Sequence, residues 1–299
     1  MLQCAINFFC KTKSVSNRNK LGELLPSIDR YLSSYSISNA IINGKPFLAS
    51  RLGWLEAYSV GEYDEKGRIS SGIKAKLWNT PGIFPETDDL FKRFYGFFTE
   101  AVGQADLLGL LKSPYEKSTI ERHGKSPLLC ELSDLEPYFS PTPWSAHLKG
   151  KKVLVVHPFQ KSINRQYQAC REKIFINSSI LPEFELITFC PPQTICGNTD
   201  GFLDWVDAYE STVAKIGKID FDVAIVGSGS YGLPIGAFIK SMGKVCVHLG
   251  GSTQNLFGIT GSRWMKMPQF RAMMNPYWVR PLEEERPPNW EKAEKGCYW

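Results

Sequence analysis

The chain has 299 residues, of which 43% are hydrophobic and 22% are charged, the proportions of an ordinary globular protein. Its net charge of +5 at pH 7 is mild and spread along the chain, and no basic run alternates with aromatic residues, so we expect no nucleic-acid partner. No apolar stretch is long enough to cross a bilayer, which argues against an integral membrane protein.

The cysteines give a second constraint on the class of protein. The eight cysteines form no CxxC pair, and no spacing among them matches a zinc site. The opening residues have too short an apolar run for a signal peptide. We therefore expect a cytoplasmic protein with reduced thiols. The mild positive charge also allows peripheral association with the inner face of an anionic membrane.

In the first half of the chain, short strands are expected between longer helices. Apolar residues at helical spacing, among them Leu21, Leu25 and Ile28, predict the first helix. In chain order, the expected elements are a helix over 17–34, a strand over 46–51, a turn into a helix over 52–58, a loop over 70–85, a helix over 88–102 capped by Thr87 or Glu86, a strand over 105–111, a polar segment over 112–127, a short helix or turn over 132–139 and a linker over 141–144.

The second half has a clearer pattern of alternating strands and helices. The expected elements are a strand over 153–156, a polar helix over 161–176, a strand over 184–189 and a helix over 200–217. This alternation predicts an α/β protein with a Rossmann-like, mostly parallel sheet and helices on both faces. We expect a single domain over 1–299, with a helical N-terminal decoration over 1–44 and a surface tail over 276–299.

The most informative stretch is a strand–turn–helix–strand unit over residues 221–251. A buried strand over 223–226 precedes a glycine-rich turn, a helix over 233–242 and a second strand over 245–249. The candidate anion ligands in the turn are Gly227, Ser228, Gly229, Tyr231 and Gly232. Glycines let the backbone approach a ligand, and a helix start offers free N–H groups to a diphosphate. The alternative is a structural turn in which a helix packs close to the sheet.

The turn fits the spacing G-x-G-x-x-G, but the next strand lacks the acidic residue that holds a ribose in dinucleotide sites. That strand ends in His248, followed by Gly250, instead. A redox dinucleotide is therefore the less favoured ligand.

Four turns that follow predicted strands carry polar or glycine residues, over 51–56, 157–165, 227–232 and 248–254. The carboxyl ends of parallel strands meet at one edge of the sheet, where ligands bind. Glu56 could act as a base or bind a divalent metal, or it could be a helix-start glutamate stabilised by the helix dipole. Arg51 lies beside it and could neutralise a phosphate.

Four further residues are candidate ligands of a donor molecule. His157 could donate to a phosphate or take a proton, or it could satisfy a buried carbonyl. His248 together with Gly250 could form a second anion or ribose pocket. Arg263 could clamp a diphosphate, or it could form a surface contact with the adjacent Trp264.

The stretches over 153–167 and 227–264, together with the end of the chain over 294–299, resemble bacterial surface-polysaccharide biosynthesis proteins. Those proteins are similar to glycosyltransferases of the GT-D fold. The pattern of that fold, Arg-Phe-Gly-Asp-Gly-Glu, corresponds here to residues 51–56, in which the arginine, glycine and glutamate match and Trp54 replaces the aspartate. The resemblance covers residues 45–60 weakly and 145–299 more strongly.

The resemblance implies a nucleotide-sugar donor, a glycan or lipid-linked acceptor, and a role in lipopolysaccharide, capsule or exopolysaccharide assembly. It implies Mn²⁺ or Mg²⁺ at Glu56, and the missing aspartate argues against that metal. In the resulting hypothesis Glu56 and Arg51 are catalytic, and the turn binds the donor. Two alternatives remain open: a non-catalytic nucleotide-sugar binding component of an assembly complex, and a transferase of another substituent such as pyruvyl.

Overall fold

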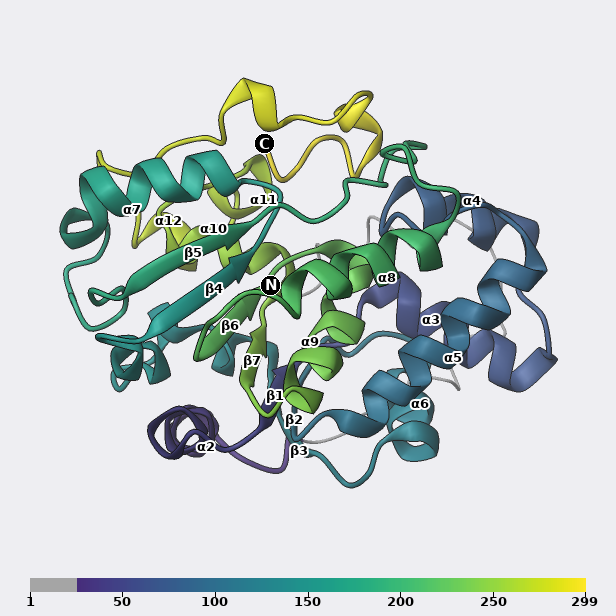
Figure 1. Ribbon diagram of the computed structural model, residues 1–299, viewed down its shortest axis with the longest axis horizontal. Helices are drawn as coiled ribbons and strands as arrows, with labels where there is room; N and C mark the ends of the chain where they lie inside the picture. The colour runs from purple at the N-terminus through teal and green to yellow at the C-terminus, as the bar shows by residue number, and fades with distance from the viewer. Residues whose placement is uncertain (1–25) are drawn as a thin grey trace.

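Seven parallel strands form the centre of the computed structural model, which describes residues 26–299 (Figure 1). In chain order they are β1 (Phe47–Ser50), β2 (Leu107–Leu110), β3 (Leu128–Glu131), β4 (Lys152–Val156), β5 (Glu185–Phe189), β6 (Val223–Val226) and β7 (Val245–His248). Their order across the sheet is β3-β2-β1-β7-β6-β4-β5, and every neighbouring pair is parallel.

Helices cover both faces of this sheet, as expected. They are α2 (Arg30–Asn43), α3 (Trp54–Lys66), α4 (Ser71–Asn79), α5 (Asp88–Gln104), α6 (Glu116–His123), α7 (Gln160–Ile174), α8 (Trp205–Ile216), α9 (Gly232–Ser241), α10 (Thr253–Leu256), α11 (Ser262–Met265) and α12 (Pro268–Arg271). Successive strand residues point to opposite faces, so Leu154 belongs to the buried cluster that includes residues of α5, α8 and α9, whereas Val155 belongs to the cluster that includes residues of α2, α7 and the C-terminal segment. The chain therefore has the predicted α/β, Rossmann-like fold.

The α5 helix shows how the sequence specifies a covering helix. The Thr87 side chain accepts a hydrogen bond from the Leu90 amide at 3.2 Å, which confirms the predicted cap. Phe91, Phe94 and Phe98 then recur at helical spacing and are all buried. This stripe fixes the face that α5 turns toward the sheet.

Several predicted boundaries in the first half are wrong. The helix expected over 17–34 begins at Arg30, after the cap Asp29, and continues to Asn43, while residues 17–25 lie outside the described part. The expected loop over 70–85 contains α4, and the polar segment over 112–127 contains α6. The edge strand β3 was not expected at all, because it is four residues long and only Cys130 in it is buried.

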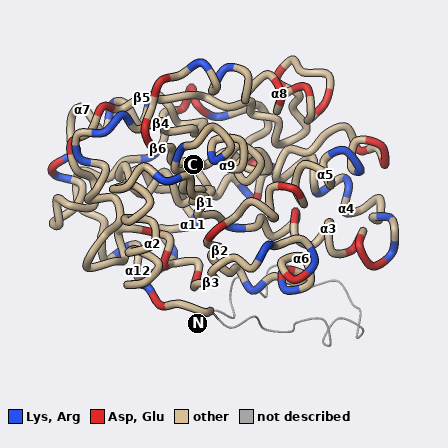
Figure 2. Tube along the Cα trace, turned by 60° about the horizontal axis from the view of Figure 1, so that its bottom comes forward, with Lys and Arg blue, Asp and Glu red and all other residues tan. Residues whose placement is uncertain are grey.

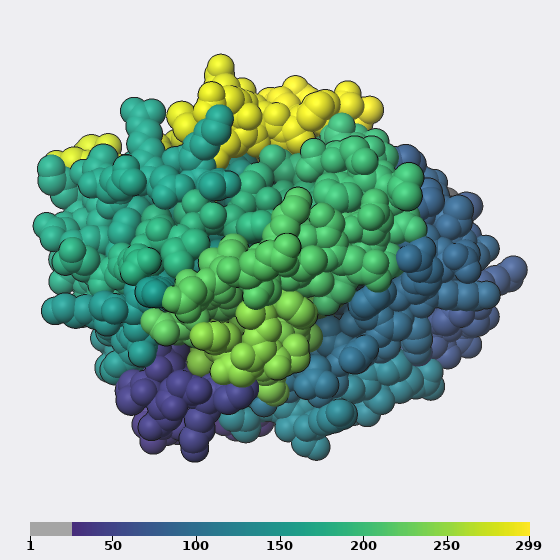
Figure 3. Space-filling view, viewed as in Figure 1, coloured from purple at the N-terminus to yellow at the C-terminus, as the bar shows by residue number. Residues whose placement is uncertain are grey.

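The C-terminal stretch, shown in yellow in Figures 1 and 3, lies along one side of the molecule. It is more than the surface tail that the sequence suggested, because Ala293 and Trp299 are only 1% and 3% exposed. The Trp299 ring lies 5.8 Å from that of Phe159, which directly precedes α7. The end of the chain is therefore part of the core at the carboxyl side of the sheet.

The chain leaves β4 and β6 in opposite directions across the sheet, toward β5 at one edge and toward β7 at the centre. In open parallel sheets, such a reversal leaves a crevice outside the carboxyl ends of the strands, where ligands bind. Figure 2 shows acidic and basic residues interspersed along the trace, in keeping with the mild net charge. Among the described helices, none has the length and apolar character required to traverse a bilayer.

Candidate functional site

Arg51 is the main cation at the carboxyl edge of the sheet. It follows β1 directly and is half-buried, and its Nε donates to the Leu52 carbonyl at a long 3.5 Å. Within residues 26–299 its guanidinium takes part in no ion pair. Burial lowers the pKa of Arg51 from its ordinary value, but a guanidinium keeps its charge in proteins. The edge therefore holds a positive charge without a directly bonded carboxylate.

Glu56 lies close to this cation, in the first turn of α3. It is 8% exposed, and burial raises its pKa, against the opposing charge of Arg51. Its carboxylate folds back over Gly53, the residue at the helix start: a Cβ at position 53 would lie 2.0 Å from the Glu56 carboxyl carbon. This geometry suits a helix-start glutamate. It also places a carboxylate with a raised pKa beside Arg51.

The structure differs from the sequence-based hypothesis over which amides of the glycine-rich turn are free to bind a ligand. The Gly227 amide donates to a carbonyl of β4 at 2.8 Å, and the amides of Tyr231 and Gly232 donate to carbonyls within the turn. The amides of three of the five candidate residues in the turn are therefore already bonded. The prediction that Gly227, Tyr231 and Gly232 bind the ligand through their N–H groups is wrong.

Two of these glycines are explained by packing. A Cβ on Gly232 would lie 2.1 Å from Nε2 of His248, and one on Gly227 would lie 2.8 Å from Cδ2 of His157. The imidazole rings therefore fill the space in front of the turn. The structural alternative considered for the turn accounts for Gly227 and Gly232.

The remaining donors of the turn belong to Ser228 and Gly229. The hydrogen bonds of residues 26–299 leave both amides unpaired, and the Ser228 hydroxyl is buried without a partner in the same part of the chain. Gly229 is exposed and has φ of +55°, which favours glycine. Ser230, by contrast, is bonded to Pro81 through both its amide and its hydroxyl.

A single residue separates this turn from Arg51. A Cβ on Gly227 would lie 2.5 Å from the carbonyl oxygen of Gly250, and a Cβ on Gly250 would lie 3.3 Å from both Cδ and Nη1 of Arg51. Gly250 has φ of +61°, so glycine is required there by conformation as well as by space. The structure thus brings the turn and Arg51 to the same part of the edge.

The two histidines are buried and neutral rather than cationic. Burial lowers the pKa of both His157 and His248 to about 3. Nδ1 of His157 accepts from the Phe159 amide at 3.0 Å, and Nδ1 of His248 lies 2.9 Å from the Ser50 hydroxyl. Neither imidazole readily takes a proton at neutral pH, whereas donation of a ring N–H to a phosphate by His157 and the anion or ribose pocket at His248 stay predictions.

Arg263 is held by the end of the chain. It forms an ion pair with Glu294, its Nη1 donates to the Tyr298 hydroxyl at 3.2 Å, and its guanidinium lies 4.7 Å from the centre of the Tyr298 ring. The Tyr298 ring in turn packs on Gly251, where a Cβ would approach it to 2.6 Å. Arg263 is therefore ion-paired within the protein, whereas Arg51 forms no ion pair in residues 26–299.

Sequence reasoning missed two buried carboxylates that face the same edge. Glu116 accepts hydrogen bonds from the amides of residues 111–113 after β2. Glu136 follows β3, and burial raises its pKa to about 7, against smaller opposing effects of Ser252 and Arg51. The short apolar run at 128–130 was the signal for β3, and recognising that strand would have placed Glu136 at the edge.

Glu136 makes the stability of the protein dependent on pH. The folded state binds the Glu136 proton more tightly than the unfolded state, in which the pKa has its ordinary value of 4.5. The unfolding free energy therefore falls as pH rises from about 4.5 through about 7. Relative to wild type, Glu136→Gln is expected to gain about 2 to 3 kcal/mol of unfolding free energy between pH 5 and pH 8. Urea denaturation at both pH values measures this difference.

The exposed Glu283 provides the control, since Glu283→Gln is expected to leave the pH dependence of wild type intact. Equal pH profiles for wild type and Glu136→Gln would show that the Glu136 proton is bound equally in both states.

Metal binding at Glu56 remains a prediction. Within residues 26–299, no group of three or more His, Cys, Asp or Glu side chains is arranged to hold an ion. Trp54, which replaces the aspartate of the resembling pattern, stacks on Tyr58 with ring centres 5.6 Å apart. Any metal at Glu56 would therefore need ligands from the substrate or from water.

Comparisons with known proteins add little to this site. No family model matches the sequence, and no curated protein matches it either. One solved structure, reported as "The highly conserved domain of unknown function 1792 has a distinct glycosyltransferase fold", matches with 12% identity and a TM-score of 0.36. The match covers 74% of this chain and 82% of that chain. A likeness this slight carries no argument about activity.

Proposed function

We propose that this protein is a glycosyltransferase that moves a sugar from a nucleotide-sugar donor to a glycan or glycolipid acceptor. The observation that carries the proposal is Arg51, a charged guanidinium that forms no ion pair within residues 26–299 and lies at the carboxyl edge of a parallel sheet. A diphosphate leaving group gains negative charge as the sugar bond breaks, and a preorganised cation stabilises that charge. The resemblance to surface-polysaccharide biosynthesis proteins makes the sugar nucleotide the preferred diphosphate.

The donor would be bound between Arg51 and the turn after β6. The two unpaired amides of Ser228 and Gly229 point to a second set of donors for phosphate oxygens, with the Ser228 hydroxyl beside them. Gly250 would let the ligand lie close to the backbone between Arg51 and the turn. His157 and His248 would support the turn by packing against Gly227 and Gly232.

Glu56 is the proposed base. In the transfer step the acceptor hydroxyl oxygen bonds to the anomeric carbon, its proton passes to the Glu56 carboxylate, and the nucleoside diphosphate leaves with the electron pair of the broken bond. The raised pKa of Glu56 makes its carboxylate a stronger base than an exposed glutamate. Manganese or magnesium, if it takes part, would bind Glu56 and the diphosphate.

The test is a panel of nucleotide sugars, each added with and without manganese. A donor at a hundredfold its dissociation constant is expected to raise the unfolding free energy by about 2.7 kcal/mol, seen as a thermal shift. With a glycan or lipid-linked acceptor, release of nucleotide is expected, and Glu56→Gln is expected to slow it by about 10²–10⁴-fold. Absence of both binding and release across the panel would overturn the proposal.

A second candidate function is non-catalytic binding of a nucleotide sugar within an assembly complex. Two observations favour it: Trp54 in the place of an aspartate, and the carboxylate of Glu56 folded back on Gly53 as in a helix cap. A thermal shift without nucleotide release, unchanged in Glu56→Gln, would decide for this function.

A further inference from the structure

A cavity of about 280 Å³ lies between helix α7 and the C-terminal segment that follows α12, and Arg51 is not among the residues that line it. In Figure 1 the yellow stretch of the chain passes beside α7. One wall is a face of α7 that includes Ser162, Arg165 and Ala169, and the opposite wall is formed by residues between 276 and 282. The cavity has the liquid volume of about nine water molecules, which is room for a ligand of about ten non-hydrogen atoms.

Hydrogen bonds between the two walls hold the cavity in a fixed shape. Nε2 of Gln166 donates to the Tyr277 carbonyl at 2.8 Å, and the Leu282 amide donates to the Ser162 hydroxyl at 2.9 Å. At the other end, the indole N–H of Trp278 donates to the carbonyl of the last residue of α7 at 3.1 Å. A site that is already formed loses little conformational entropy when a ligand binds.

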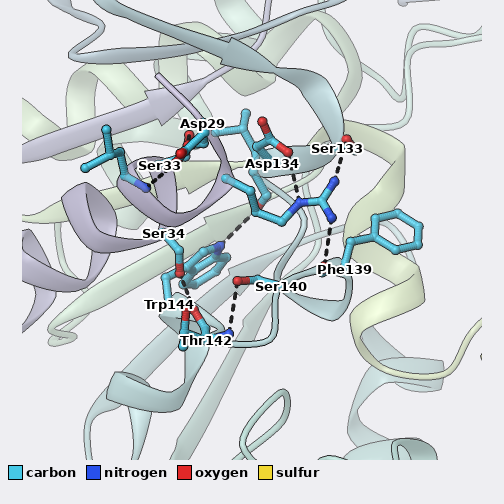
Figure 4. A network of polar contacts seen from close by, with 12 residues as sticks. Asp29, Ser33, Ser34, Ser133, Asp134, Phe139, Ser140, Thr142 and Trp144 are labelled. Carbon is cyan, nitrogen blue, oxygen red and sulfur yellow. Dashed lines mark hydrogen bonds and ion pairs between the residues drawn. The ribbon is translucent and has the colours of Figure 1, made fainter. Parts of the chain in front are cut away.

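Each wall carries an arginine that lacks a counter-charge. Arg165 of α7 and Arg280 of the C-terminal segment both line the cavity, and neither forms an ion pair within residues 26–299. Nη1 of Arg280 lies 3.1 Å from the sulfur of Met265, and a thioether is a weak acceptor. Arg30 of α2 is a contrasting case, since it pairs with Asp134 at 2.9 Å in the network of polar contacts in Figure 4.

The acidic residues that directly follow the cavity wall are bonded to other groups. Glu283 pairs with Arg286 at 3.5 Å, and Glu284 pairs with Lys161 at 2.9 Å. Glu285 accepts a hydrogen bond from the Lys161 amide at 2.7 Å, at the start of α7. The residues that line the cavity include no Asp or Glu. The two arginines of the cavity therefore have no carboxylate of the described chain to neutralise them.

The cavity combines positive charge with apolar surface. Burial, followed by the charge of Arg286, lowers the pKa of Arg280, so an anion beside Arg280 relieves an unfavourable interaction. Ala169, Pro276 and Val279 supply apolar parts of the walls. A small molecule that has an anionic group joined to an apolar group matches both properties.

We propose that this cavity binds a small phosphate monoester, whose phosphate is held by Arg165 and Arg280 and whose organic group lies against Ala169 and Val279. A phosphate monoester carries close to two negative charges at neutral pH, and guanidinium groups match the geometry of phosphate oxygens. The volume fits a soluble ester and not the two acyl chains of a membrane lipid. This inference does not depend on the proposed transferase activity.

The test is calorimetric titration of the full chain with phenyl phosphate, inorganic phosphate and dihexanoyl phosphatidic acid. Phenyl phosphate is expected to bind about tenfold more tightly than inorganic phosphate, because its ring buries apolar surface. It is also expected to bind about tenfold more tightly than the phosphatidic acid, whose chains exceed the cavity. Arg165→Ala/Arg280→Ala is expected to weaken the binding of phenyl phosphate at least about tenfold.

Two further variants separate this cavity from general surface charge. Arg68→Ala/Arg271→Ala removes the same charge at two exposed arginines that do not line the cavity, and it is expected to bind phenyl phosphate as wild type does. Ala169→Leu keeps both arginines but narrows the cavity at an exposed helix position. It is expected to weaken the binding of phenyl phosphate about tenfold and to leave that of inorganic phosphate nearly unchanged.

Four outcomes would overturn the inference. They are no binding of phenyl phosphate, equal binding by wild type and Arg165→Ala/Arg280→Ala, equal binding of phenyl phosphate and inorganic phosphate, and tighter binding of the phosphatidic acid. Loss of binding in Arg51→Ala alone would place the phosphate at the carboxyl edge of the sheet, against this inference and in keeping with the proposed function. Failure of the nucleotide-sugar panel, by contrast, has no bearing on this cavity.

Discussion

Arg51→Ala is expected to reduce nucleotide release from the preferred donor by about 10³-fold. The guanidinium forms no ion pair with a carboxylate of residues 26–299, so its charge is available to the leaving diphosphate. Arg263 cannot replace it, because Glu294 and Tyr298 already occupy that side chain. The measurement is steady-state release of nucleotide with each donor that gives a thermal shift.

The exposed Arg68 provides a matched control, and Arg68→Ala is expected to retain wild-type activity and stability. Arg51→Lys separates charge from geometry, since lysine keeps the charge but loses the two-pronged donor. It is expected to recover only part of the loss. Wild-type rates in Arg51→Ala, in a protein of unchanged melting temperature, would remove the observation on which the proposed function rests.

Gly232→Ala is expected to destabilise the protein by about 3 kcal/mol. Gly232 has φ of −61° and ψ of −50°, which alanine adopts readily, so the backbone conformation does not disfavour the substitution. The cost comes from the added methyl group, which would lie 2.1 Å from Nε2 of His248. That ring is buried and lies 2.9 Å from the Ser50 hydroxyl, so it cannot swing aside freely. Urea denaturation at pH 7 measures the loss.

Gly72→Ala is the control, because Gly72 is also helical and a Cβ there meets nothing within 4 Å. It is expected to be neutral or to stabilise by up to about 1 kcal/mol. In Gly232→Ala/His248→Ala the obstructing ring is gone, so the double variant is expected to be more stable than the sum of the single effects allows. Strict additivity would mean that the two residues do not meet.

The second half of the fold was predictable because its signals are local. Short buried strands with two or three β-branched residues, each followed by a turn into a helix, predicted β4, β6, α9 and β7 nearly to the residue. The first half was harder, since β3 is short and α4 begins in a segment rich in serine and glycine. In both places the tertiary contacts of a few side chains, such as Leu77 in α4, outweigh weak local preference.

The sequence by itself determined the α/β class, the parallel sheet and the edge where Arg51 and the glycine-rich turn are found, because these follow from residue periodicity and from the rule that parallel strands share their carboxyl edge. Only the tertiary structure decided which groups at that edge remain unsatisfied. It placed imidazole rings against Gly227 and Gly232, paired Arg263 with the end of the chain, and left Arg51 without an ion pair in residues 26–299. Hydrogen bonds and ion pairs between residues far apart in the chain depend on atomic distances, which a linear pattern of residue types does not contain.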